Sequence, residues 1–223
     1  MSSRHVYAAP SILSADFSRI QDEVAKVGAA GAEFIHLDVM DGKFVPNKTF
    51  GPDLVKEIAP SCGSMLKDTH LMVFDPHIAA KEFAKAGSDL ITFHYEAYDN
   101  DEERLNCIRV IQECGCQVGM SIKPMTAPEV LVPFLPLLDL VLVMSVEPGK
   151  GGQSFMPESL QKLAFLRNEI DKLGRNIYLE VDGGINDKTG ALVVEAGADV
   201  LVAGSYLYGH DDYADRIRGL MAL

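Results

Sequence analysis

The chain alternates eight times between an apolar run of strand length and a longer segment in which apolar residues recur at helical spacing. This repeat predicts β/α units, in which each helix returns the chain so that successive strands pair in parallel. The expected strands are Val6–Pro10, Glu33–Val39, Ser64–Met72, Leu90–His94, Gln117–Ile122, Leu138–Ser145, Ile177–Val181 and Val200–Ala203. The expected helices lie near Phe17–Ala29, Pro52–Ile58, Pro76–Ala86, Glu102–Cys114, Pro128–Leu135, Pro157–Leu173, Lys188–Ala196 and Tyr213–Leu220.

Eight such units in 223 residues favour a closed (β/α)8 barrel, the TIM-barrel architecture, whose usual length is about 250 residues. A doubly wound open sheet is the alternative, but it usually has fewer units. The turn after the first expected strand also lacks the G-x-G-x-x-G sequence of a dinucleotide site. No linker-like stretch or shift in composition divides the chain. We therefore expect residues 1–223 to form one α/β domain with its chemistry at the C-terminal strand ends.

The net charge is −12, from 20 basic and 32 acidic residues, and no basic block occurs. This balance argues against binding to nucleic acid or to an anionic membrane surface. An anionic small molecule would need a local cradle of backbone amides, because the net charge could not attract it.

The first residues lack the apolar core of a signal peptide, and no apolar run is long enough to span a bilayer. The four cysteines, Cys62, Cys107, Cys114 and Cys116, lack the spacing of a disulfide framework or a zinc knuckle. We therefore expect free thiols and a cytoplasmic location.

The second expected strand runs into the sequence HLDVMDG, residues 36–42. Side chains two apart on a strand share a face, so His36 and Asp38 point the same way. An imidazole beside a carboxylate is a candidate pair of ligands for a divalent metal ion. The alternative is that His36 is a hydrogen-bonded core residue and Asp38 caps local backbone. His70, at the end of the neighbouring third strand, favours the metal site because it adds another donor.

Other strand ends carry residues with two interpretations each. Ser11 either places a hydroxyl at the barrel mouth or caps a turn. His94 and Glu96 have the same two-residue spacing, and form either a rival metal site or a supporting pair. Lys123 could form a Schiff base, although the proline directly after it favours a solvated or loop-pairing lysine.

The last three strands end in glycine-rich turns. Their small residues are Gly149, Gly151, Gly152, Gly183, Gly184, Gly204 and Ser205. Such turns expose backbone N–H groups, and barrels commonly bind phosphate at this edge, so we predict a phosphate site. Asp182, at the end of the seventh strand, would face Asp38 across the mouth. Uncompensated carboxylates repel, which suits a catalytic pair better than a structural one.

Together these motifs resemble the ribulose-phosphate 3-epimerase family over essentially the whole chain. The matching phrases are PSILSADF at 10–17, HLDVMDGKFVPN at 36–47, THLMV at 69–73, MSVEPGKGGQSF at 144–155, EVDGGI at 180–185 and VAGS at 202–205. The resemblance implies that one metal ion is bound by His36, Asp38, His70 and Asp182, and that Asp38 and Asp182 are also the acid–base pair. It implies that the substrate is contacted by Ser11, His70, Met40, Met72, Met144, Gly149, Gly151, Gly152, Gly183, Gly184, Gly204 and Ser205.

The implied reaction is inversion at C3 of a ketose phosphate, converting D-ribulose 5-phosphate to D-xylulose 5-phosphate in the pentose phosphate pathway. One carboxylate would remove the acidic C3 proton and the other would return a proton to the opposite face. The cis-enediolate between these steps carries charge that a divalent cation would stabilise as a Lewis acid. Two imidazoles and two carboxylates suit zinc, with Fe(II), Mn or Co as alternatives, and no organic cofactor is needed. We also expect a homo-oligomer.

Two residues depart from the family pattern. Lys150 stands where many members have Phe, and Met125 where a small residue is common. Because of these departures, the six-carbon D-allulose 6-phosphate is an alternative substrate.

Three other classes of protein fit the sequence less well. A Schiff-base aldolase would use Lys123 and need no metal. Related phosphate-binding decarboxylases would need a lysine between Asp38 and Asp41, where this chain has Val39 and Met40. A non-catalytic sugar-phosphate-binding barrel would have no use for Asp182.

Overall fold

The computed structural model describes residues 4–223, and within them eight parallel strands form one sheet. The strands are β1 (Tyr7–Pro10), β2 (Phe34–Met40), β3 (Leu66–Met72), β4 (Leu90–His94), β5 (Gln117–Ile122), β6 (Leu140–Met144), β7 (Tyr178–Asp182) and β8 (Val200–Ala203). Their order is β1-β8-β7-β6-β5-β4-β3-β2. A parallel bridge between Ser11 and His36 joins the two end strands and closes the sheet. The predicted (β/α)8 barrel is confirmed.

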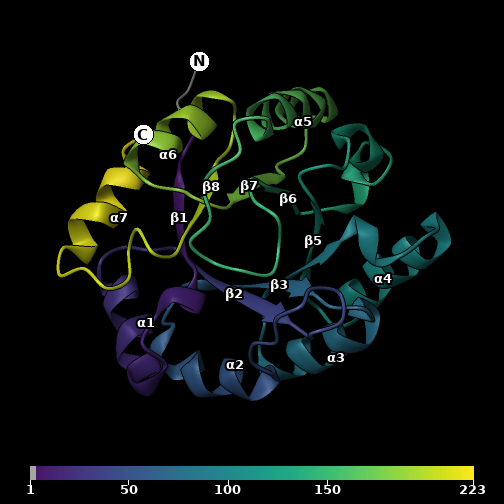
Figure 1. Cartoon of the computed structure of the whole chain (residues 1–223). Coiled ribbons are helices and arrows are strands. Elements are labelled where there is room, and N and C mark those ends of the chain that lie inside the picture. The colour runs from purple at the N-terminus through teal and green to yellow at the C-terminus, as the bar shows by residue number, and fades with distance from the viewer. Residues whose placement is uncertain (1–3) are drawn as a thin grey trace.

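Seven α-helices within residues 4–223 surround the barrel (Figure 1). They are α1 (Ile20–Ala29), α2 (Pro52–Ile58), α3 (Pro76–Ala86), α4 (Asp101–Glu113), α5 (Ser159–Leu173), α6 (Asp187–Glu195) and α7 (Tyr213–Met221). Their apolar faces pack on the outside of the sheet, where most of the hydrophobic core lies. No helix in this part of the chain combines the length and apolar character needed to cross a membrane.

The connection from β5 to β6 differs from the sequence prediction. A helix near Pro128–Leu135 was expected, and this is wrong: the segment forms two short 3₁₀ turns, Pro128–Leu131 and Leu135–Leu137. Pro133 and Pro136 lack the N–H that a continuing α-helix would use, so an α-helix does not extend through this segment. The apolar spacing of the segment still buries Leu131 and Leu135, as it would in a helix.

The barrel interior is apolar at its N-terminal end. Tyr7, Phe34 and Tyr178 stack there in pairwise T-shaped contacts, with ring centroids 5.3–5.4 Å apart. Ala9, Leu66, Leu90, Leu140, Val200 and neighbouring apolar side chains fill the rest of this layer. Because these side chains close the N-terminal end of the barrel, the accessible mouth is at the C-terminal ends of the strands.

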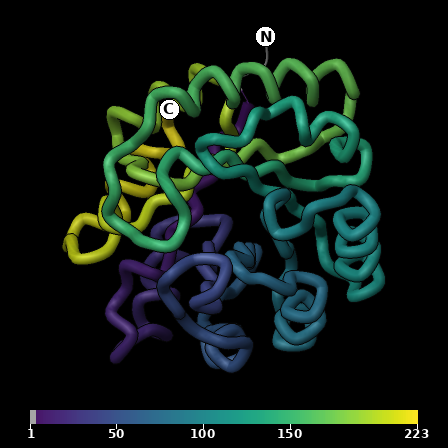
Figure 2. The backbone as a smooth tube through the Cα atoms, turned by 45° about the vertical axis from the view of Figure 1, so that its right-hand side comes forward, coloured from purple at the N-terminus to yellow at the C-terminus, as the bar shows by residue number. Residues whose placement is uncertain are grey.

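The long connection between β6 and α5 partly covers this mouth. It is the green loop that crosses in front of the strands in Figure 1 and stands out from the barrel in Figure 2. It contains Gly149, Gly151 and Gly152, and it lines the cavity described below.

Elsewhere in the fold, the four cysteines are free, as expected.

Candidate active site

The ends of β2, β3 and β7 bring four metal-binding side chains together. His36, Asp38, His70 and Asp182 each offer a ligand atom, and these atoms all lie within 4.8 Å of one another. We call these residues the His/Asp cluster. Asp38 and His70 are register partners on adjacent strands, and His36 shares the inward face of β2 with Asp38. The four residues singled out from the sequence therefore converge on one point.

The donor atoms of the cluster fit a divalent cation. His36 Nε2 is buried and lies 3.3 Å from Asp38 Oδ1, and it has no hydrogen-bond partner within residues 4–223. His70 Nδ1 lies 3.2 Å from the same carboxylate oxygen. Imidazole nitrogens and carboxylate oxygens that converge in this way are typical ligands of zinc and of the other first-row divalent metals.

The electrostatics of the cluster also favour a cation. Burial opposes protonation of His36, but the charges of Asp38, Asp68 and Glu180 outweigh it and raise the pKa of His36 well above its ordinary value. Burial would likewise raise the pKa of Asp38, yet His36 holds it well below the ordinary value. Burial and the charge of Asp38 raise the pKa of Asp182 to about 7. Without a metal, the cluster therefore recruits protons to balance its negative charge.

Two acids that sequence reasoning missed lie beside His36 in the barrel interior. Asp68 Oδ2 is 2.5 Å from His36 Nδ1, and Glu180 Oε1 is 3.5 Å from the same nitrogen. Both acids are fully buried. Burial and the charge of Asp68 raise the pKa of Glu180 well above its ordinary value. Each lies two residues before a member of the His/Asp cluster, and this spacing was the signal that they share its inward face.

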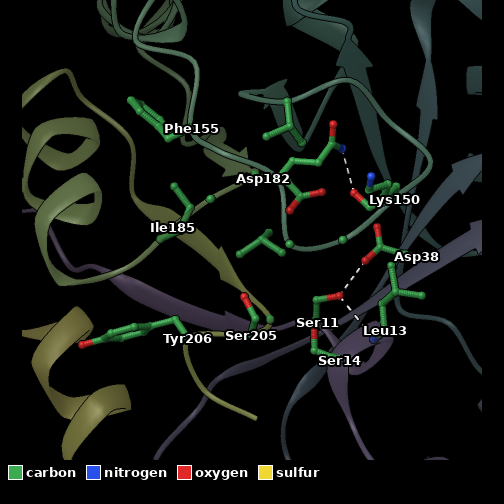
Figure 3. Close-up of a pocket in the computed structure, with 18 of the residues that line it drawn as sticks. Ser11, Leu13, Ser14, Asp38, Lys150, Phe155, Asp182, Ile185, Ser205 and Tyr206 are labelled. Atoms are coloured by element: carbon green, nitrogen blue, oxygen red, sulfur yellow. Dashed lines mark hydrogen bonds between the residues drawn. The ribbon is translucent and has the colours of Figure 1, made fainter. Parts of the chain in front are cut away.

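Ser11 has both of the roles considered from the sequence. Its Oγ donates a hydrogen bond of 2.6 Å to Asp38 Oδ2 and accepts one of 3.4 Å from the backbone N–H of Leu13 (Figure 3). The hydroxyl thus caps the 3₁₀ turn Ile12–Ser14 and fixes one oxygen of Asp38. The other Asp38 oxygen remains directed toward the two histidines of the cluster.

A cavity of about 510 Å³ opens above the cluster. Asp38 and Asp182 both point into it (Figure 3). Met40, Met72 and Met144 contribute to its wall and are almost fully buried. These thioethers give the wall a polarisable surface without a proton donor.

The glycine-rich turns line the same cavity. All the turn residues predicted from the sequence take part: Gly149, Gly151, Gly152, Gly183, Gly184, Gly204 and Ser205. Within residues 4–223, the backbone N–H groups of Gly184, Gly204 and Ser205 donate to no backbone acceptor. Such free amides at the edge of a cavity can receive an anion.

The structure separates two reasons for these glycines. Gly184 has φ +63°, and a Cβ there would lie 2.6 Å from the backbone nitrogen of Phe155, so the fold itself requires glycine. Gly204 has no such backbone constraint, and the close contacts of an added Cβ would be with the Ser14 side chain, whose Oγ would lie at 2.6 Å. Gly204 is therefore the position where ligand access explains glycine better than folding does.

Two amide side chains that were not predicted hold the β6–α5 loop. Asn47 Nδ2 donates to the carbonyl of Gly149 at 2.7 Å. Gln153 Nε2 donates to the carbonyls of Glu147 and Lys150 at 2.6 and 2.7 Å. These bonds engage loop carbonyls and leave loop N–H groups for the cavity. The Asn47 contact joins residues distant in sequence, and the two Gln153 contacts depend on the path of an irregular loop, so no periodic pattern predicts either.

The rival pair, His94 and Glu96, does not join the His/Asp cluster. His94 Nε2 lies 2.9 Å from His70 Nε2, and His94 Nδ1 lies 3.2 Å from Glu96 Oε2. The pair is thus placed to support a cluster member. Lys123 Nζ lies 4.1 Å from the centroid of the Phe44 ring, which agrees with a lysine paired to a loop.

Comparison with known proteins identifies relatives over nearly the whole chain. The sequence model of the Ribulose-phosphate 3 epimerase family matches residues 7–208. A ribulose-phosphate 3-epimerase from Synechocystis sp. is 44% identical over 218 residues, which cover 98% of this chain and 94% of that protein. One from Mycobacterium bovis is 46% identical over 212 residues, with coverages of 95% and 90%.

Solved structures of other proteins share the barrel. A 3-keto-L-gulonate-6-phosphate decarboxylase from Vibrio cholerae superposes with a TM-score of 0.73 at 14% identity, covering 98% of each chain. A 3-hexulose-6-phosphate synthase gives a TM-score of 0.69 at 19% identity, again covering 98% of each chain. At these identities the likeness concerns the fold alone.

Proposed function

Because this chain belongs to the ribulose-phosphate 3-epimerase family and is an epimerase, we propose that it inverts C3 of a ketose phosphate, converting D-ribulose 5-phosphate to D-xylulose 5-phosphate. One observation carries the proposal. Two aspartates from well-separated strands, β2 and β7, enter a single cluster of ligand atoms beside a cavity rimmed by glycine-rich turns. The cluster offers acid–base groups and the turns offer a phosphate cradle, as this reaction requires.

Asp38 and Asp182 are the proposed acid–base pair. The C3–H of a ketose is acidified by the C2 carbonyl, so a carboxylate can remove it and leave an enediolate. The second carboxyl then delivers a proton to the opposite face of C3, which inverts its configuration. The pKa of Asp38 is held low and that of Asp182 is raised to about 7, so the free site already contains one base and one carboxyl able to hold a proton.

His36, Asp38, His70 and Asp182 would hold one divalent metal ion, for which zinc suits the donor set and Fe(II), Mn and Co are alternatives. When bound, such an ion supplies Lewis-acid stabilisation of negative charge that develops on substrate oxygens. Ser11 holds Asp38 in place through its 2.6 Å hydrogen bond.

The remaining residues of the cavity position the substrate. Free N–H groups at Gly184, Gly204 and Ser205 would bind the phosphate. Met40, Met72 and Met144 would surround the reacting carbons, and because they offer no proton they would not quench the enediolate. We further infer that the enzyme acts in the cytoplasm, in the pentose phosphate pathway, as a homo-oligomer.

The test is to measure epimerisation of D-ribulose 5-phosphate and D-allulose 6-phosphate side by side. A higher kcat/KM for the pentulose phosphate supports the proposal. A clear preference for the hexulose phosphate would assign the chain to the alternative substrate, to which the unusual Lys150 at the cavity would then contribute. Ribulose without phosphate is the control, and an equal kcat/KM for it would contradict the phosphate cradle.

A further inference from the structure

His94 and Glu96 form a buried hydrogen-bonded chain that ends on His70. His70 and His94 are fully buried, with Nε2 of each ring 2.9 Å from the other. His94 Nδ1 lies 3.2 Å from Glu96 Oε2. The chain leads from the His/Asp cluster to the turn after β5.

The second oxygen of Glu96 is anchored in that turn. Oε1 accepts a 2.7 Å hydrogen bond from the backbone N–H of Lys123 and another from the hydroxyl of Thr126. Burial would raise the pKa of Glu96, but its hydrogen bonds to His94, Thr126 and the Lys123 amide lower it to about 2. Glu96 is therefore an ionised carboxylate, which can only accept hydrogen bonds.

The donor and acceptor roles along the chain follow from this anchor. A carboxylate facing His94 Nδ1 requires that this nitrogen carry the hydrogen. A neutral imidazole carries a single ring hydrogen, so with that hydrogen on Nδ1 the Nε2 of His94 is bare. The bare Nε2 must accept a hydrogen bond from His70, which places the hydrogen of His70 on Nε2. His70 Nδ1 is then bare, and it is the nitrogen 3.2 Å from Asp38 Oδ1.

We propose that His94, held by Glu96, is a positioning residue that fixes the tautomer and ring orientation of His70 for metal binding. This inference rests on the metal site of the proposed function. If the chain were broken, His70 could place a hydrogen on Nδ1 and donate it to Asp38, which would block the lone pair needed by the metal. Carboxylate-anchored partners of metal-binding histidines commonly affect metal affinity by about 10- to 100-fold.

The sharpest test is Glu96→Gln, which keeps the shape of the side chain. If the amide oxygen stays against the Lys123 N–H, the NH₂ group faces His94 Nδ1, and this nitrogen must become the acceptor. The donor order along the chain then reverses. Thr126→Val is the matched control, because it removes a bond to the same carboxylate without touching His94.

Two readouts are measured without substrate. The dissociation constant for Zn²⁺, from competition with a chromophoric chelator, should rise about 10- to 100-fold in Glu96→Gln and stay unchanged in Thr126→Val. The ring nitrogens of His70 in ¹⁵N-histidine-labelled, metal-free protein should show a protonated Nε2 in wild type and a protonated Nδ1 in Glu96→Gln. A purely structural role would not move the second readout.

A second pair of variants covers the case in which Glu96→Gln fails to fold. Gln at position 94 can offer an oxygen near the place of Nε2, whereas Asn reaches only the place of Nδ1 and leaves His70 without an acceptor. His94→Gln should therefore retain Zn²⁺ better than His94→Asn. The proposal would be overturned if Glu96→Gln bound Zn²⁺ as tightly as Thr126→Val, His94→Gln bound it as tightly as His94→Asn, and the His70 tautomer stayed unchanged. It would also be overturned by a wild-type protein that binds no metal. If the Zn²⁺ affinities of the variants followed the predicted order but the wild-type protein did not catalyse epimerisation, the proposed function alone would be overturned.

Discussion

Asp38 and Asp182 contribute to one cluster of ligand atoms, yet the protein lowers the pKa of Asp38 and raises that of Asp182 to about 7. Burial opposes ionisation of both. His36 beside Asp38 reverses that effect, whereas the charge of Asp38 adds to it at Asp182. Opposed shifts in a pair of acids are typical of sites that must hold a base and an acid at once.

The raised pKa of Asp182 predicts a specific pH dependence of stability in the metal-free protein. Between the ordinary value of 3.8 and about 7, the folded state holds a proton that the unfolded chain has released. The free energy of unfolding should therefore decrease as pH rises through this interval. Urea unfolding of metal-free protein across this range should show a smaller decrease for Asp182→Asn than for wild type. The same pH dependence in both proteins would count against the raised pKa.

Removal of the metal should abolish activity. Protein treated with a chelator should regain epimerisation on addition of Zn²⁺, Fe²⁺, Mn²⁺ or Co²⁺, because the donor set suits these ions. His70→Ala should lose the metal, since it removes a ligand nitrogen from the cluster. His5→Ala changes an exposed histidine outside the cluster and is the matched control. Full activity in protein shown by elemental analysis to be metal-free would refute the metal site.

Gly204→Ala should weaken binding of the phosphate. The new methyl group would crowd an amide that the ligand needs, and a hydrogen bond to a charged group is worth about 1.5–3 kcal/mol, so KM should rise about 10- to 100-fold. The double variant Ser14→Ala/Gly204→Ala removes the contact with Ser14 Oγ and should keep the high KM. Gly219→Ala, at an open position on α7, is the control. Recovery of a normal KM in the double variant would attribute the defect to the Ser14 contact.

One thiol should react much faster than the others. Burial raises the pKa of Cys62 and Cys116 to about 11 and that of Cys107 to about 12, whereas Cys114 is exposed at the end of α4. The thiolate is the reactive form, so a disulfide reagent should label Cys114 first in the folded protein. The fast phase should vanish in Cys114→Ser and persist in Cys116→Ser. Its survival in Cys114→Ser would show that burial does not control reactivity here.

The strand ends were predictable because two local rules act together. Alternation along a strand puts His36 and Asp38 on one face, and parallel pairing brings the ends of neighbouring strands to one edge. Barrel closure then carries Asp182, distant in sequence, to the same point. The β5–β6 connection was mispredicted because apolar spacing resembled a helix, while Pro133 and Pro136 prevented one.

The part of the site that was not predicted lies in specific side-chain contacts, which the spacing of residues along a strand does not determine. Asp68 and Glu180 are acids within strands, and only the closed barrel shows that both are fully buried beside His36. Asn47 and Gln153 bind loop carbonyls, and such bonds depend on how the loop folds back over the mouth. The His94–Glu96 pair was visible in the sequence by its spacing, but its contact with His70 required the structure.

Asp38 and Asp182 are proposed to act on opposite faces of C3, and hydrogen exchange at this carbon separates their roles. A variant that lacks one base can still remove a proton from the other face and return it there. Asp38→Asn and Asp182→Asn should each lose nearly all epimerisation, by at least the 10²–10⁴-fold that acid–base catalysis is commonly worth. Each should still exchange C3–H of one epimer with solvent deuterium.

The measurement is to incubate each variant, with its metal content verified, with D-ribulose 5-phosphate and with D-xylulose 5-phosphate in D₂O, and to follow the C3 proton by NMR. The two variants should exchange opposite epimers without inverting them. Exchange of the same epimer by both variants would contradict the assignment of one aspartate to each face.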